Sequence, residues 1–150
     1  MPAASRTHRP ANAGLLARRL ALLALFEGEF RPGSAPAALE RIATEREVAE
    51  DTRDHARRIV AGVAAHLAEL DARIAAEAPL IPVAELGRVE RTILRSALYE
   101  VLYSAATPSG DTMRDAVSLA RIYAGDAARR LVNGVLGSVS RSGGGAHSSD

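Results

Sequence analysis

The sequence predicts an all-α protein built from two packed three-helix subdomains. Apolar residues recur every three or four positions through most of the chain, which is the period of one helix face. Alanine makes up about a fifth of the 150 residues, and no segment shows the strict alternation of a half-buried strand. With 47% hydrophobic and 25% charged residues, the composition is that of a globular domain and excludes disorder for most of the chain.

A short basic arm precedes the first predicted helix. Residues 1–9 carry no apolar period and are expected to be flexible. Pro10 fits the first turn of a helix, because its missing N–H needs no partner there. Apolar residues then recur with helical spacing from Leu16 to Phe30, and the Arg-Pro-Gly turn that follows ends the helix.

Two further helices complete the first half. Ser34 is a suitable N-cap for a short second helix. A single long third helix follows from Val48 until Pro79 stops it, and Gly62 weakens this helix without interrupting it. The Pro-Leu-Ile-Pro segment at its end is a stiff connector. We therefore expect a domain at 10–140 with subdomains at about residues 10–78 and 83–140.

The second half predicts three helices, of which the first is the most buried. The segment from Val83 to Leu102 is apolar around most of its circumference, as a central helix requires. Asp111 or Thr112 is expected to cap the next helix, and Gly125 ends it. The last helix starts directly afterwards.

This last helix contains an Asn-Gly pair at 133–134, which in other contexts marks a β-hairpin. The apolar residues around the pair nevertheless keep helical spacing, so we favour the helix. Gly134 and Gly137 are expected to let a neighbouring helix approach closely. Residues 141–150 are rich in glycine and serine and predict a flexible tail.

We find no enzyme signature, cofactor site or complete metal site. The chain has no cysteine, which excludes disulfides, thiolate zinc sites, iron–sulfur clusters and thiol nucleophiles. Asp51, Asp54 and His55 share one helix face and resemble half of a carboxylate-bridged metal site, but the second half is missing, so a solvated charged face is favoured. No apolar run approaches the roughly 20 residues that span a bilayer, and we expect a cytoplasmic protein without a membrane partner.

The basic residues leave two interpretations open. All 19 are arginine, and the first 26 residues hold four of them without any acidic residue. Arg88, Arg91 and Arg95 form a second stripe on the central helix. Such stripes either track phosphates or form a solvated face that nearby carboxylates neutralise.

The tyrosines also allow two interpretations. Tyr99 and Tyr103 are one helical turn apart, whereas Tyr123 stands alone. The pair is either a platform for stacking nucleobases or a part of the core with hydrogen-bonded hydroxyls, and we favour the core.

Four segments, in this order and spacing, resemble the NusB family of transcription antitermination factors. They are LALLALF at 20–26, LGRVERTILRSALYE at 86–100, DAVSLAR at 115–121 and LVNGVL at 131–136. The resemblance covers about residues 10–140 and implies an all-helical fold of two packed subdomains. It also implies a protein that is not an enzyme and needs no cofactor. The implied partners are the ribosomal protein NusE, single-stranded boxA RNA and the transcription elongation complex.

The resemblance also implies which residues carry these contacts. RNA contact is expected at Arg18 and Arg95, supplemented by Arg9 and Arg19. NusE contact is expected at Glu90, Asp126 and Leu131.

Two other functions remain open from the sequence. A helical protein-interaction scaffold with weak or no RNA binding is the main alternative, because Gly14, Leu15 and Leu16 stand where other family members often carry arginine. An RNA-binding module of an RNA-modifying enzyme would require a catalytic domain that the 150 residues do not contain. The chain is expected to be a monomer or a homodimer.

Overall fold

The structure, a computed structural model, describes residues 12–104 and 109–148, and these residues are largely helical. No strand occurs in these two ranges, which confirms the predicted all-α fold. The helices are α2 (Ala13–Phe30), α3 (Ala35–Glu45), α4 (Glu50–Ala65), α5 (Leu67–Glu77), α6 (Arg88–Tyr103), α7 (Ser109–Ala124) and α8 (Asp126–Ser148), with a short 3-10 turn, η1 (Val83–Glu85), before α6.

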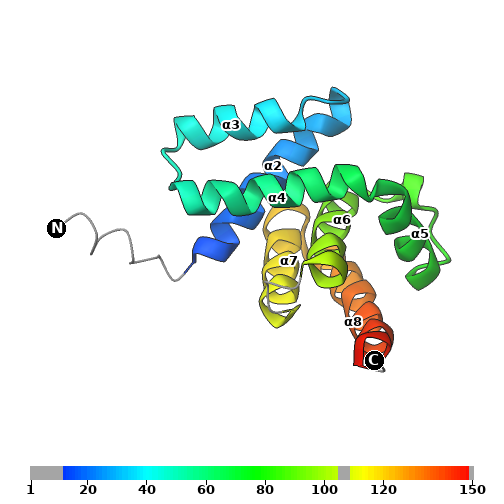
Figure 1. Cartoon of the computed structure of the whole chain (residues 1–150). Coiled ribbons are helices and arrows are strands. Elements are labelled where there is room, and N and C mark those ends of the chain that lie inside the picture. The colour runs from blue at the N-terminus through cyan, green and yellow to red at the C-terminus, as the bar shows by residue number, and fades with distance from the viewer. Residues whose placement is uncertain (1–11, 105–108, 149–150) are drawn as a thin grey trace.

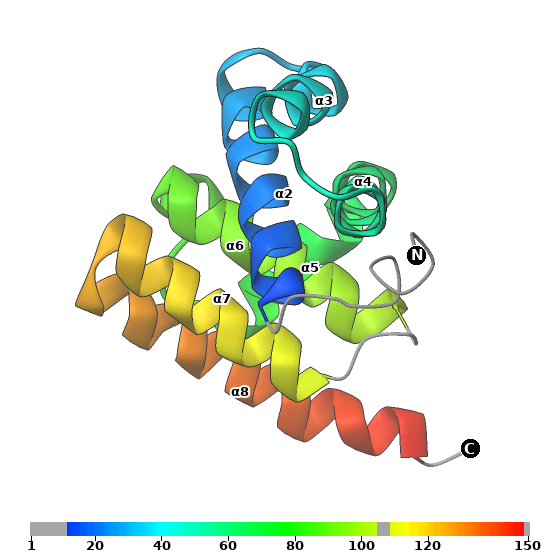
Figure 2. The same cartoon turned by 90° about the vertical axis from the view of Figure 1, so that its left-hand side faces the viewer.

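Helix α6 lies at the centre of the fold and contacts α2, α4, α5, α7 and α8. Helix α2 packs against α3 and α4 as well as against α6 and α7 (Figure 1). Helices α7 and α8 lie side by side along their length (Figure 2). The prediction of a central helix is confirmed, although α6 begins at Arg88 rather than at Val83, because Val83 belongs to the 3-10 turn.

Buried apolar side chains from both halves of the chain form one continuous core. Leu39 and Ile59 contribute from the first half, and Leu94, Leu98 and Leu136 contribute from the second. The predicted connector joins α5 to η1, but α5 itself packs against α6 and α8. The core therefore extends across the connector.

The predicted single third helix is wrong, because two helices occupy this segment. Helix α4 ends at Ala65, and α5 starts at Leu67. His66 between them leaves the helical conformation, with φ −118° and ψ 21°. The change of direction allows Leu70 and Ile74, which are fully buried, to enter the shared core. The burial of α5, which the local sequence does not reveal, explains the break.

Two glycines end segments as predicted, whereas the start of α7 differs from the prediction. Gly33 and Gly125 have φ of +86° and +97°, which glycine adopts at little cost. Helix α7 already starts at Ser109, so Asp111 and Thr112 lie in its first turn and do not cap it. Asp111 complements the positive end of the helix there.

The C-terminal helix is longer than the sequence predicts. Helix α8 continues to Ser148, so the flexible tail predicted for 141–150 is wrong as far as that residue. The hydroxyl of Ser142 binds the carbonyl of Ser138 at 3.2 Å and accepts a hydrogen bond from Arg73 of α5 at 3.1 Å. These bonds secure the helix beyond the predicted end. The basic arm at 1–9 and residues 149–150 lie outside the described residues.

The Asn-Gly pair at 133–134 is helical, as favoured from the sequence, but the glycines do not admit a neighbouring helix. Gly134 faces open space, and a Cβ at Gly137 would meet only the Arg141 side chain, at 3.4 Å. The expected close approach at these two positions is therefore wrong, because both lie away from the packed face of α8.

Candidate nucleic-acid and partner interface

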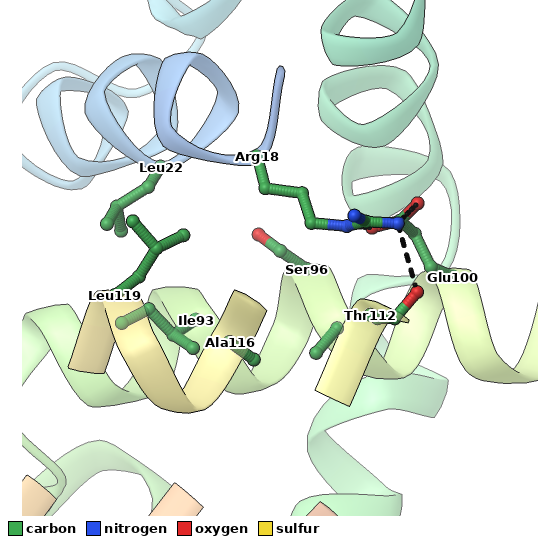
Figure 3. Close-up of a pocket in the computed structure, with 9 residues that line it drawn as sticks. Arg18, Leu22, Ile93, Ser96, Glu100, Thr112, Ala116 and Leu119 are labelled. Carbon is green, nitrogen blue, oxygen red and sulfur yellow. Dashed lines mark hydrogen bonds and ion pairs between the residues drawn. The ribbon is translucent and has the colours of Figure 1, made fainter. Parts of the chain in front are cut away.

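Arg18 of α2 is the centre of a buried ionic network. Its Nε donates to Oε1 of Glu100 at 2.8 Å, and its Nη1 donates to Oδ2 of Asp115 at 2.7 Å. Its Nη2 donates to the second oxygen of Glu100 and to the hydroxyl of Thr112, both at 3.2 Å. Figure 3 shows the side chain extending from α2 toward Glu100 and Thr112. The network joins α2 to α6 and α7.

His55 extends the network to α4. Its Nε2 lies 2.8 Å from Oε2 of Glu100. Burial alone raises the pKa of Glu100, but the hydrogen bonds from His55 and Arg18 outweigh this effect and hold the pKa below its ordinary value. Burial likewise lowers the pKa of Arg18, but Glu100 and Asp115 outweigh it and raise that pKa. The network is therefore a charged cross-link within the core.

A small cavity borders this network. It has a volume of about 20 Å³, enough for one water molecule, and it lies between α2, α6 and α7 (Figure 3). Arg18 and Glu100 line its polar side, and Leu22, Ile93 and Leu119 line its apolar side. The cavity is too small for a ligand larger than water.

The expected RNA contact at Arg18 stays a prediction, and the position of Arg18 weighs against it. The residue is only 7% exposed, and all three guanidinium nitrogens bind carboxylate or hydroxyl oxygens inside the protein. A phosphate would have to displace two buried carboxylates to reach it. Arg18 therefore joins α2 to α6 and α7 from inside the protein.

Arg19, the next residue, occupies the outer side of α2. It is half-buried, and within the described residues it has no ion-pair or hydrogen-bond partner. Helical spacing places it on one face with Leu16 and Leu23, and none of these three belongs to the buried core. Of the two predicted RNA contacts on α2, Arg19 is the more exposed, although its Nε is buried and has no hydrogen-bond partner. Arg9 lies outside the described residues.

The stripe on α6 is used mainly inside the protein. Arg95 binds both carboxylate oxygens of Asp71, at 2.7 and 2.8 Å, and contacts Glu29 at 3.1 Å. Arg91 also pairs with Glu29. Arg88 is exposed and lies 4.6 Å from the centre of the Phe30 ring. The expected RNA contact at Arg95 would therefore compete with two carboxylates.

The residues expected to contact NusE lie around the start of α6 and the turn between α7 and α8. These two places are at the same end of the molecule (Figure 2). Glu90 is half-buried in the first turn of α6. Asp126 is exposed and binds Arg129 at 2.7 Å. Leu131 is partly buried and packs against the core.

Sequence analysis missed two exposed apolar side chains beside the α7–α8 turn. Ile122 is 56% exposed and Tyr123 is 40% exposed, at the end of α7. Ile122 falls outside the helical face of Met113, Ala116 and Ala120, and this departure was the available signal, whereas Tyr123 continues that face and gave no such signal. Together with Asp126 they give this end of the molecule an apolar patch beside a charged residue.

The described residues hold no metal-binding cluster of three or more histidine, aspartate or glutamate side chains. His55, one member of the suspected half-site, instead binds Glu100. Within 12–104 and 109–148, no helix is both long enough and apolar enough to cross a membrane.

Comparison with known proteins gives consistent matches. A sequence model of the NusB family matches residues 15–141. The transcription antitermination protein NusB of Symbiobacterium thermophilum is 38% identical over 133 residues, covering 83% of this chain and 87% of the relative. The protein of the same name from Chloroflexus aggregans is 35% identical over 138 residues, covering 91% and 87%.

Two solved structures share the fold. One holds the antitermination factors NusB and NusE in complex with double-stranded RNA, and the similar chain has a TM-score of 0.80 and 25% identity, covering 89% of this chain and 99% of that one. The other is NusB of T. maritima, with a TM-score of 0.79 and 27% identity, covering 89% and 93%.

Proposed function

Since the chain belongs to the NusB family, we propose that it is a transcription antitermination factor that binds RNA jointly with NusE. The observation that carries this proposal is the match over nearly the whole chain to a protein solved with both NusE and RNA. The RNA is a single-stranded boxA-type element of a nascent transcript within the elongation complex. Such a role places the protein in the cytoplasm.

The RNA-binding surface in this proposal is the outer face of α2. Arg19 supplies an unpaired guanidinium there, and Arg9, which lies outside the described residues, is the second arginine that we assign to RNA contact from the sequence. On the buried face of α2, Arg18 binds Glu100 of α6 and Asp115 of α7. These bonds hold the outer face of α2 in a fixed orientation. Arg95 contributes only if RNA displaces one of its carboxylate partners.

The NusE-binding surface is the end of the molecule formed by the start of α6 and the α7–α8 turn. Its contacts are Glu90, Asp126 and Leu131, joined by the exposed Ile122 and Tyr123. An apolar patch with charged residues at its edge is typical of protein interfaces.

The NusE-binding surface meets the last turn of α2, about 15 Å along that helix from Arg19. Arg88 and Arg91 at the start of α6 contact Phe30 and Glu29 at the end of α2. RNA and NusE can therefore bind at separate places along α2, and two weak surfaces acting together give a higher affinity than either alone.

The test is an RNA titration with a boxA-like single strand and a scrambled strand, with and without NusE, at two salt concentrations. We expect sequence-selective binding that tightens when NusE is present. Arg19→Glu is expected to weaken binding and to reduce the salt slope by about 1, as loss of one phosphate contact does. Arg46→Glu is the matched control, because Arg46 is exposed and unpaired among the described residues but follows α3.

Equal and weak binding in all arms would contradict the proposal. It would favour the scaffold alternative, which the burial of Arg18 already supports to some extent because it leaves α2 with fewer available arginines. The NusE surface is tested with Ile122→Asp, which should abolish NusE binding without unfolding the chain. Leu131→Asp is less suitable, because Leu131 packs against the core.

A further inference from the structure

Three aromatic rings stack where the α4–α5 junction meets the end of α6. The rings of His66 and Tyr103 are 3.9 Å apart between centroids, with an interplanar angle of 15°. The Tyr99 ring lies 6.1 Å from each of them, at 27° to His66 and 19° to Tyr103. The three ring planes are thus nearly parallel.

The α4 backbone supports this stack at Gly62. A Cβ at that position would lie 2.1 to 2.5 Å from three carbons of the Tyr99 ring, so the ring lies directly against the helix. Nδ1 of His66 is held 3.0 Å from a carboxylate oxygen of Glu69. The backbone at Gly62 therefore fixes the Tyr99 ring, and Glu69 fixes the His66 ring.

The two tyrosines have different environments, which resolves the alternatives that the sequence left open. Tyr99 is half-buried and packs against the core, as favoured from the sequence. Tyr103 is 42% exposed and is not part of the core. The favoured interpretation holds for Tyr99 and is wrong for Tyr103, because one turn of α6 carries the chain from the core to the surface.

An unpaired cation lies on the same helix as the glycine that supports the stack, about 12 Å along the axis from His66. Arg58 precedes Gly62 by one helical turn, or about 6 Å along the axis, on the side of α4 that adjoins α6. It is exposed and has no ion-pair partner within 12–104 and 109–148. Its neighbour Arg57, in contrast, binds Glu40, Glu50 and Asp54.

We propose that Tyr103 and His66 form a stacking platform for an unpaired RNA base, with Arg58 contacting the neighbouring phosphate. The proposal rests on the RNA-binding function proposed above and adds a second place of contact. Flat, parallel rings accept any base, because every base has a π-face, and arginine binds phosphate in a planar, bidentate manner. RNA is favoured over a protein segment by the combination of an unpaired guanidinium with exposed ring surface.

The platform lies far from the NusE surface. Tyr103 and Glu90 are at opposite ends of α6, about 20 Å apart at 1.5 Å per residue. A bound strand that reaches the platform therefore extends beyond the outer face of α2. NusE does not need to contact this part of the strand.

The experiment compares a fluorescent single strand with a duplex of the same sequence, titrated at low salt without NusE. Tyr103→Ala is expected to raise the Kd for the single strand about fivefold or more, the usual effect of losing one base stack, and to leave the Kd for the duplex unchanged. Tyr103→Phe keeps the ring and should bind like the wild type. Arg58→Ala should weaken binding and reduce its salt dependence.

Leu80→Ala is the control, because Leu80 is an exposed apolar side chain of the connector and belongs to none of the stacks and to neither proposed surface. Thermal melting of each variant verifies the fold. Wild-type affinity of Tyr103→Ala for the single strand would overturn the platform and leave the proposed function intact. Equal losses for single strand and duplex would also overturn it, since base pairing hides the stacking faces. A wild-type chain that binds no RNA without NusE overturns the platform, and failure with NusE as well overturns the proposed function.

Discussion

Replacement of Arg18 by alanine is expected to destabilise the protein by about 3–5 kcal/mol, the range found when one partner of a buried ion pair is removed. The variant loses four hydrogen bonds and leaves Glu100 with His55 alone and Asp115 with only the longer 3.8 Å contact to Arg114. The side chains of these carboxylates are only 2% and 9% exposed, so water that enters the vacated space does not restore the charge of the guanidinium. At about 2–4 °C per kcal/mol for a chain of this size, the Tm should fall by roughly 6–20 °C.

Urea denaturation followed by circular dichroism measures this change. Arg19→Ala is the control, because the neighbouring arginine has no partner among the described residues and its loss should change stability by no more than about 0.5 kcal/mol. RNA affinity is measured well below the Tm of each variant. An Arg18→Ala protein with wild-type stability and lost RNA affinity would show that Arg18 faces phosphates, and would refute the buried network.

The remaining predictions concern two glycine substitutions and the dependence of the Tm on pH below about 4.5. Gly62→Ala should destabilise the protein by about 1–3 kcal/mol, because the new methyl group overlaps the Tyr99 ring. Gly134→Ala, where the new methyl group faces open space, should stabilise it by about 0.5–1 kcal/mol. Equal effects of the two variants in urea denaturation would contradict the packing at Gly62. Because the folded pKa of Glu100 lies below the ordinary 4.5, its ionised form stabilises the fold above that pH, and this contribution is lost as the pH falls through the lower folded pKa. The Tm should therefore decline below about pH 4.5, and Glu100→Gln should show a shallower decline; an unchanged decline would argue against the network.

Most of the helices could be predicted because their signals are local. The apolar period of α2, the turn after Phe30 and the left-handed Gly125 all act within a few residues of one another. The break at His66 had no such signal, since no proline or glycine stands there. It arises because α5 packs on α6 and α8, which requires a change of direction.

The site was harder to predict, because its side chains are paired over long distances in the sequence. Arg18 binds partners 82 and 97 residues away, and Arg95 binds Asp71, 24 residues before it. No pattern along one helix reveals such pairs. The family resemblance identified the basic positions, but only the packing of the helices decides which of them face water.

The division of the arginines sets the strength that RNA binding can reach without NusE. Arg18, Arg91 and Arg95 form ion pairs with carboxylates of neighbouring helices. Arg19 and Arg58, in contrast, have no ion-pair partner among the described residues. Three phosphate contacts on a single strand, at Arg9, Arg19 and Arg58, give a salt slope of about −2.1, or roughly an 18-fold loss of affinity between 50 and 200 mM salt. A measured slope steeper than about −4 would mean that arginines outside the proposed contacts also bind phosphates. With a shallow slope, affinity at physiological salt has to come from stacking and from NusE, which makes RNA binding conditional on the partner.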